Sequence, residues 1–138
     1  MKRLLVIVCL ALSISDAVGA DWSVAFNNVL LPETGAAYCM QKDKDGLLWI
    51  GTGDGLFCYD GYRCYHKRGN IPVEPYGIQA MLVIDDIVYL GCDNGLYVYD
   101  IPTSRFECLI SEICEINALH LYGDIIYIGC KEGCGYGI

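Results

Sequence analysis

The chain has 138 residues, of which 54% are apolar, and its formal net charge is −8. This apolar fraction argues against a disordered chain, because it supplies ample side-chain surface for a folded core. The excess of acidic groups argues against nucleic acid as a partner, since affinity for nucleic acid begins with Lys and Arg neutralising phosphates.

The N-terminus predicts an export signal. Residues 1–3 are Met-Lys-Arg, residues 4–14 are almost wholly apolar, and small residues lead to Ala20. The apolar run is well short of the roughly 20 residues that a spanning helix needs. We therefore expect residues 1–20 to be a cleaved signal peptide and the rest to be periplasmic, with no later membrane span. The alternative is an uncleaved signal that anchors the chain, because Asp16 is unusual so near a cleavage site.

An internal repeat dominates the rest of the chain. Residues 48–60 read LWIGTGDGLFCYD, residues 88–100 read VYLGCDNGLYVYD, and residues 126–133 begin the pattern again as IYIGCKEG. The first glycine recurs at positions 51, 91 and 129, so the spacings are 40 and 38 residues. A period of this length is typical of repeat architectures such as propellers.

Each repeat alternates short β-type runs with turn residues, which predicts antiparallel strands joined by tight turns. Hairpin turns are expected near 53–55, 93–95 and 131–133. The expected strands are 37–42, 47–52, 56–60 and 62–66, then 78–84, 87–92, 96–100 and 105–110, then 116–122, 125–130 and part of another strand before 138. We therefore predict an all-β partial propeller of about three four-stranded antiparallel blades, at 37–68, 76–111 and 116–138, with the third incomplete.

Residues 41–52 (QKDKDGLLWIGT), with Gly55-Leu56 and Tyr59-Asp60-Gly61 after them, resemble the repeat of two-component regulator propellers. The later copies depart from it, with Tyr for Trp and Cys for Thr. The resemblance implies a truncated piece of the periplasmic sensor of a bacterial hybrid histidine kinase, a group in which many members recognise glycan fragments. It also implies that residues 21–36 hold a ring-closing strand. The implied partners are a carbohydrate ligand and the remaining blades or kinase of a full-length relative.

The cysteines and histidines predict no metal, cofactor or catalytic residues. The nine cysteines leave disulfides open in an exported chain, but Cys92 and Cys130 occupy equivalent repeat positions and so follow the repeat. The sequence has no CxxC pair, and His66 and His120 stand at no ligand spacing. Residues 43–46 resemble the start of a calcium loop but lack its remaining ligands, so we expect a turn.

The repeat positions also have structural interpretations. Trp49, Tyr89 and Tyr127 share one position, and we expect them to pack between blades rather than to stack on a sugar. The glycines at 51, 91 and 129 are expected to mark close approaches of neighbouring strands or side chains. Three blades would leave apolar faces and a strand edge uncovered, so residues 21–138 alone are expected to aggregate or oligomerise.

Candidate ligand-binding residues are identified only by the place that they are expected to occupy in a propeller. In a propeller, the turns between second and third strands and the connections between blades emerge on one face that commonly binds ligands. This places Asp54, Asp93, Asn94 and Tyr76 as candidates and identifies no ligand. The leading function is a non-enzymatic sensing module. The alternative is a fragment of an exported polysaccharide-acting propeller enzyme, which would need converging carboxylates, histidines or tyrosines.

Overall fold

The computed structural model describes residues 35–111, 115–133 and 135–138 of the chain. The described residues all belong to one compact unit. The predicted signal peptide and nearly all of the predicted ring-closing segment lie outside the described residues. Within the described ranges, no helix is long and apolar enough to cross a membrane.

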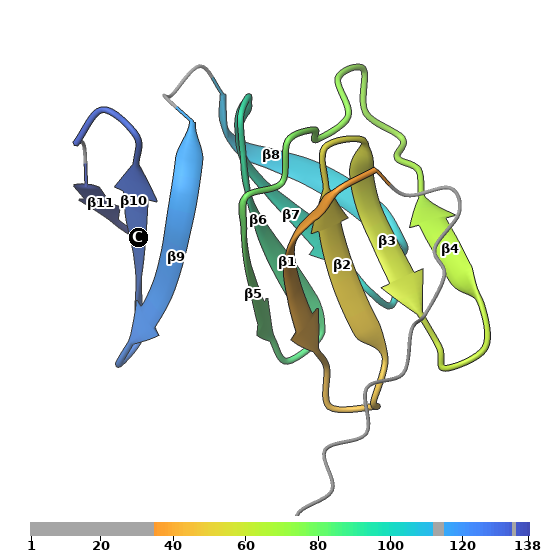
Figure 1. Ribbon diagram of the computed structural model, residues 1–138. Helices are drawn as coiled ribbons and strands as arrows, with labels where there is room; N and C mark the ends of the chain where they lie inside the picture. The colour runs from red at the N-terminus through yellow and green to blue at the C-terminus, as the bar shows by residue number, and fades with distance from the viewer. Residues whose placement is uncertain (1–34, 112–114, 134) are drawn as a thin grey trace, which may run out of the picture. The chain divides into compact units, whose positions relative to one another are not determined.

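The described residues form three antiparallel sheets (Figure 1). In the first two sheets the four strands lie in chain order, as in a propeller blade, and the third sheet has the order β11-β10-β9. The all-β fold predicted from the repeat is confirmed. The strands are β1 (Ala37–Lys42), β2 (Leu48–Thr52), β3 (Gly55–Tyr59) and β4 (Cys64–Lys67), then β5 (Ala80–Ile84), β6 (Ile87–Cys92), β7 (Gly95–Asp100) and β8 (Arg105–Ser111), then β9 (Ile116–Tyr122), β10 (Ile125–Cys130) and β11 (Gly135–Gly137).

The fourth strand of the first sheet begins later than expected. The prediction placed Tyr62 in this strand, whereas β4 starts at Cys64. The Asp60 carboxylate accepts hydrogen bonds from the backbone N–H groups of Tyr62 (2.8 Å) and Arg63 (2.7 Å). An aspartate that bonds to the backbone two and three residues ahead forms a turn that competes with the strand ladder. The strand therefore starts only after Arg63.

The first strand of the second sheet also begins two residues late, at Ala80 instead of 78. The Ile78 N–H donates to the Thr52 carbonyl of the first sheet (3.0 Å), and the Gln79 N–H donates to the Gly91 carbonyl of the second (2.9 Å). Ile78 thus ties one sheet to the next instead of extending β5.

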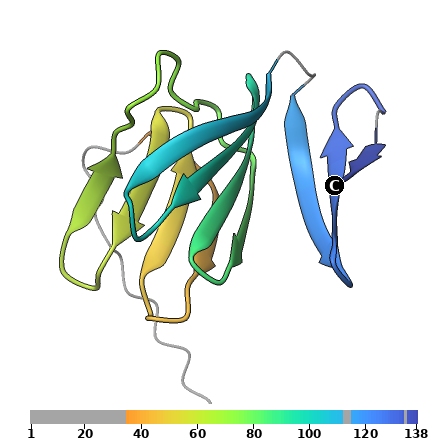
Figure 2. The same cartoon turned by 180° about the vertical axis from the view of Figure 1, so that it is seen from behind.

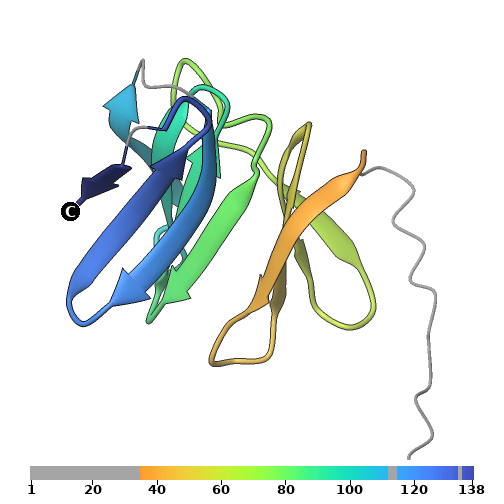
Figure 3. The same cartoon turned by 60° about the vertical axis from the view of Figure 1, so that its left-hand side comes forward.

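Two apolar cores lie between neighbouring sheets, and the second sheet contributes residues to both. Figure 2 shows the sheets from behind, and Figure 3 shows them turned by 60° about the vertical axis. In the first core, Trp49 packs on Tyr99 with ring centroids 5.4 Å apart, and Tyr99 packs on Phe106 at 4.7 Å. The second core joins Leu96 of the second sheet to three isoleucines of the third: Ile116, Ile126 and Ile128. Alternate residues of each strand of the second sheet therefore face opposite neighbours.

Two of the recurring glycines receive an isoleucine from the next sheet. A Cβ at Gly51 would lie 2.6 Å from the Cγ2 of Ile78, and a Cβ at Gly91 would lie 2.5 Å from the Cγ2 of Ile116. Both distances are too short for any side chain, so each glycine leaves a socket for an isoleucine, Ile78 two residues before β5 and Ile116 at the first position of β9. The expected close approach is confirmed at both positions. At Gly129, the nearest atom to such a Cβ is the Cβ of Ala118, 3.1 Å away.

The segment 43–46 is a turn, as predicted. The Asp43 Oδ1 accepts from the backbone N–H groups of Asp45 (3.0 Å) and Leu47 (2.9 Å), while its Oδ2 accepts from the indole Nε1 of Trp49 (2.9 Å). Both carboxylate oxygens are therefore occupied by protein donors. The turn holds the buried tryptophan in place from outside the strand ladder.

Candidate functional site

The β2–β3 and β6–β7 turns lie at the same edge of the sheets as the linker between them, residues 68–79 (Figure 1). The Gly77 N–H donates to the Gly53 carbonyl (3.0 Å), and the Asp93 N–H donates to the carbonyls of Tyr76 (3.3 Å) and Gly77 (3.2 Å). These bonds join the two turns through the linker. The predicted gathering of turns and blade connections on one face is therefore present.

Three of the four candidate residues lie together at this edge. The Asp93 carboxylate packs against Gly77, whose positive φ of 59° and lack of Cβ leave it room. The Tyr76 side chain is 50% exposed, and its backbone N–H lies 3.5 Å from the Oδ1 of Asn94. Asp54 belongs to the neighbouring turn, where its carboxylate approaches Gly35.

Asn94 joins the linker to the second sheet. Its Nδ2 donates to the Tyr97 hydroxyl (2.9 Å) and to the Glu74 carbonyl (3.3 Å). The linker is held at two further points, because Gly69 N–H donates to the Glu74 carboxylate (2.9 Å) and Phe106 N–H donates to the Asn70 side chain (3.3 Å). One amide side chain thus connects the linker, the β6–β7 turn and strand β7.

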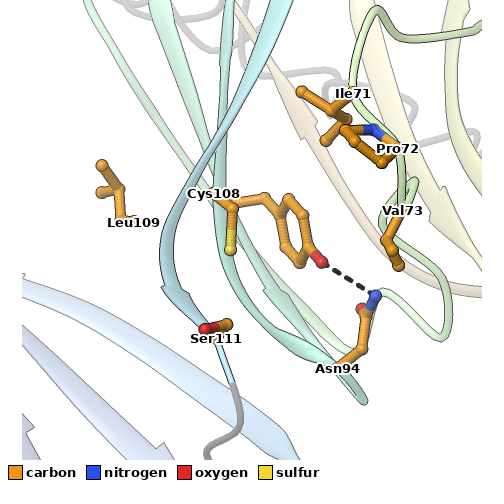
Figure 4. Close-up of a pocket in the computed structure, with 8 residues that line it drawn as sticks. Ile71, Pro72, Val73, Asn94, Cys108, Leu109 and Ser111 are labelled. Carbon is orange, nitrogen blue, oxygen red and sulfur yellow. Dashed lines mark hydrogen bonds between the residues drawn. The ribbon is translucent and has the colours of Figure 1, made fainter.

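A pocket of about 530 Å³ opens beside Asn94, between the linker and strands β7 and β8 (Figure 4). We call it the linker pocket. Linker residues line one side, and residues of β8 lie opposite them (Figure 4). Its volume falls in the range of roughly 300–1,000 Å³ that is typical of small-molecule sites. The lining residues are Ile71, Pro72, Val73, Asn94, Tyr97, Cys108, Leu109 and Ser111.

A β-bulge in β8 shapes this pocket. Leu96 pairs with Ile110, but the next residue, Tyr97, pairs with Cys108, so Leu109 has no partner on β7. Bulges bend a strand and re-aim its side chains, and they are frequent beside functional sites. Beyond the bulge, the Ile110 carbonyl presses so closely on Gly95 that no Cβ would fit there, and Gly95 has a φ of 133°.

The corresponding place in the first repeat is filled by two stacked rings. Phe57 occupies the repeat position of Tyr97 and pairs with His66, and their rings stack 4.4 Å apart with 12° between the planes. In the second repeat, the partner of Tyr97 is the smaller Cys108. The exchange of an imidazole for a thiol, together with the bulge, leaves the second repeat with an open pocket and a phenol hydroxyl in its wall.

The pocket wall carries no formal charge at neutral pH. None of its lining side chains is Asp, Glu, Lys, Arg or His. Burial, reinforced by the neighbouring Cys108, raises the pKa of Tyr97 to about 12, so this phenol stays protonated. Neutral hydrogen-bonding groups from Asn94, Tyr97 and Ser111 therefore alternate with apolar groups.

The sequence pointed to Asn94 and missed the rest of the pocket. Tyr97 and the β8 residues read as ordinary strand positions, and a bulge has no signature in the repeat. A usable signal was the Ile71-Pro72-Val73 run, because three consecutive apolar residues in a connection between blades need something to pack against.

The two histidines and two of the thiols of the described residues lie in surroundings that do not favour a nucleophile. His66 is stacked on Phe57, and His120 is exposed on β9 opposite Tyr127. Burial raises the pKa of the Cys39 thiol to about 11 and raises that of Cys92 further, which makes both poor nucleophiles. In the ranges that the structure describes, no three His, Cys, Asp or Glu side chains form a group able to hold a metal ion.

Comparison with known proteins gives one family. Residues 31–54 match the family model described as two component regulator propeller. A crystal structure described as the extracellular domain of the hybrid two component system BT4673 from B. thetaiotaomicron is 27% identical, with a TM-score of 0.66. The match covers 82% of this chain and 17% of that one. No curated protein matches.

A second structure, described as the extracellular domain of the one component system BT4673, is also 27% identical, with a TM-score of 0.64. It covers 79% of this chain and 16% of that one. The present chain thus spans about one sixth of the length of the structures it matches.

Proposed function

We propose that this chain, which matches the two-component regulator propeller model over residues 31–54, is the ligand-sensing part of a periplasmic sensor and that its ligand is a glycan fragment. The observation that carries the proposal is the 27% identity to the extracellular domain of a hybrid two component system over 82% of this chain. The remaining blades and a kinase in a longer protein would be its partners in signalling.

The edge and the linker pocket are suited to sensing because they lie where the linker meets the second sheet. A ligand that contacts both the linker and the second sheet favours the arrangement in which both contacts form. A ligand shifts a conformational equilibrium only through such differential contacts. Asn94 already bonds to the Glu74 carbonyl of the linker and to the Tyr97 hydroxyl of the sheet.

The exposed candidates at the edge complete the proposed glycan surface. Tyr76 offers a half-exposed aromatic ring, Asp93 offers a carboxylate next to Gly77, and Asp54 offers another in the neighbouring turn. Sugars commonly use aromatic faces and carboxylate acceptors together, the first for C–H surfaces and the second for hydroxyl groups. We assign these residues to binding and not to catalysis.

The test offers the full chain a panel of neutral and acidic di- to tetrasaccharides and follows both binding and product formation. Saturation-transfer NMR detects the bound sugar, and chromatography of the recovered sugar detects cleavage. We expect binding of at least one saccharide, with the sugar recovered intact. Cleavage that disappears on substitution of one side chain would support a polysaccharide-acting enzyme instead, and lack of binding across the panel would contradict glycan sensing.

A further inference from the structure

The linker pocket adjoins the edge where Tyr76 and Asp93 lie, and Asn94 contributes to both. Strands β7 and β8 are the third and fourth of their sheet, so they lie away from the neighbouring first strands β1, β5 and β9. The pocket therefore opens on the outer side of the second sheet, beneath the linker.

We propose that the linker pocket is a binding site for the end of an uncharged saccharide, held by Asn94, Tyr97 and Ser111 and covered by the apolar residues of the linker. The saccharide class rests on the proposed function, whereas the location and the preference for an uncharged ligand rest on the residues of the pocket.

The shape of the wall matches a sugar ring in two respects. Ile71, Pro72 and Val73 present a continuous apolar surface on one side, which suits the C–H face of a pyranose. The same lining includes the Ser111 and Tyr97 hydroxyls, which are neutral hydrogen-bonding groups. Small-molecule sites typically combine a mainly apolar lining with a few polar groups that fix orientation.

The Tyr97 hydroxyl is fixed before any ligand arrives. The Tyr97 side chain is 3% exposed, and its oxygen accepts the hydrogen bond from Asn94. Asn94 is fixed in turn by the Glu74 carbonyl. Binding groups that are already held in place cost little conformational entropy when a ligand binds.

The charges in and around the pocket disfavour an acidic ligand. The pocket offers a carboxylate no cationic side chain, and an unpaired charge is costly to remove from water. Two acidic residues stand just outside the lining, because Asp93 precedes Asn94 and Glu74 follows Val73. With a net charge of −8, the whole chain also repels anions.

The experiment compares maltose and cellobiose with digalacturonic acid, using saturation-transfer NMR on the full chain. This measurement observes the ligand and works on monomers and larger assemblies alike. We expect a neutral disaccharide to bind at least roughly tenfold more tightly than digalacturonic acid, which corresponds to about 1.4 kcal/mol.

Two substitutions at one position test the location. Ser111→Trp fills the pocket and should lower the affinity for the neutral disaccharide about tenfold. Ser111→Lys should raise the affinity for digalacturonic acid by a similar factor. The gain of binding cannot arise from misfolding. Thr103 is the matched control, because it is also a small exposed hydroxyl residue and lies just before the opposite end of β8. Thr103→Trp and Thr103→Lys should leave both affinities unchanged.

The outcomes separate the two proposals. If a neutral disaccharide binds wild type and Ser111→Trp equally well, the pocket assignment is overturned while glycan sensing stands. Equal binding of digalacturonic acid to the wild-type chain overturns the preference for an uncharged ligand. If neither disaccharide nor digalacturonic acid binds, the pocket proposal falls, and the wider saccharide panel decides whether glycan sensing falls with it.

Discussion

Trp49 and Tyr127 occupy the same position of the repeat, yet Trp49 is 1% exposed and Tyr127 is 48% exposed. Trp49 faces the second sheet and packs on Tyr99. Tyr127 lies on the face of the third sheet that points away from the second, where no further sheet covers it within the described residues. The repeat therefore sets the type of residue at this position, and the neighbouring sheet sets how much that residue stabilises the fold.

The largest effect should come from removing the buried member of this pair. Trp49→Ala deletes a side chain that fills the first core and donates a hydrogen bond to Asp43, so we expect a loss of about 3–5 kcal/mol in the free energy of unfolding. Tyr127→Ala should cost less than about 0.5 kcal/mol. Chemical denaturation of the full chain, followed by near-ultraviolet circular dichroism, measures both. Equal losses would show that another part of the chain covers Tyr127.

The glycine sockets give the next largest contrast. Gly91→Ala would place a methyl group 2.5 Å from Ile116, so we expect overpacking to cost about 1–3 kcal/mol. Gly129→Ala meets only Ala118, at 3.1 Å, and should cost less than about 1 kcal/mol. The same denaturation experiment compares the two. A cost at Gly129 as large as that at Gly91 would mean that a side chain also fills the third socket.

The repeat predicted the strands well because each strand depends mainly on its own residues and turns. β1, β6, β9 and β10 have the expected bounds, and the turns fall where Asp, Asn and Gly cluster. The predicted strand bounds were wrong at Tyr62 and Ile78, where a hydrogen bond to a side chain or to another sheet replaced the ladder. The predicted packing of Tyr127 between blades was also wrong, because its side chain is 48% exposed. The linker pocket could not be predicted, because it depends on the unpaired Leu109 and on linker packing far away in sequence.

The uncovered face of the third sheet should also promote self-association, and this is the third expected effect. Ile125 and Tyr127 are 45% and 48% exposed, and exposed apolar faces attract other chains. Replacing both by Lys should weaken association of the full chain about tenfold, because the two charges would have to be desolvated. Light scattering coupled to size exclusion measures the change. The control replaces Tyr62 and Val73, two exposed apolar residues outside the third sheet, by Lys. If the control weakens self-association equally, the effect comes from general surface charge and not from the face of the third sheet.

The smallest effect concerns Tyr97, which distinguishes the second repeat from the first. Tyr97→Phe restores the residue type of Phe57 and removes the acceptor of one Asn94 hydrogen bond, while Asn94 keeps its bond to the Glu74 carbonyl. We therefore expect the free energy of unfolding to fall by about 0.5–1.5 kcal/mol at neutral pH.

The wild-type chain should show an additional loss of stability at alkaline pH, because the folded pKa of Tyr97 is raised from 10 to about 12. Between these values the unfolded chain releases the phenol proton and the folded chain retains it, so stability is full below pH 10 and declines as pH rises toward 12. Tyr97→Phe should lack this part of the decline, as measured by denaturation at pH 8, 10 and 11. Tyr122→Phe, at a tyrosine that is 74% exposed, should leave stability at neutral pH unchanged. An identical alkaline decline in wild type and Tyr97→Phe would contradict the assignment of a buried, protonated phenol to the pocket wall.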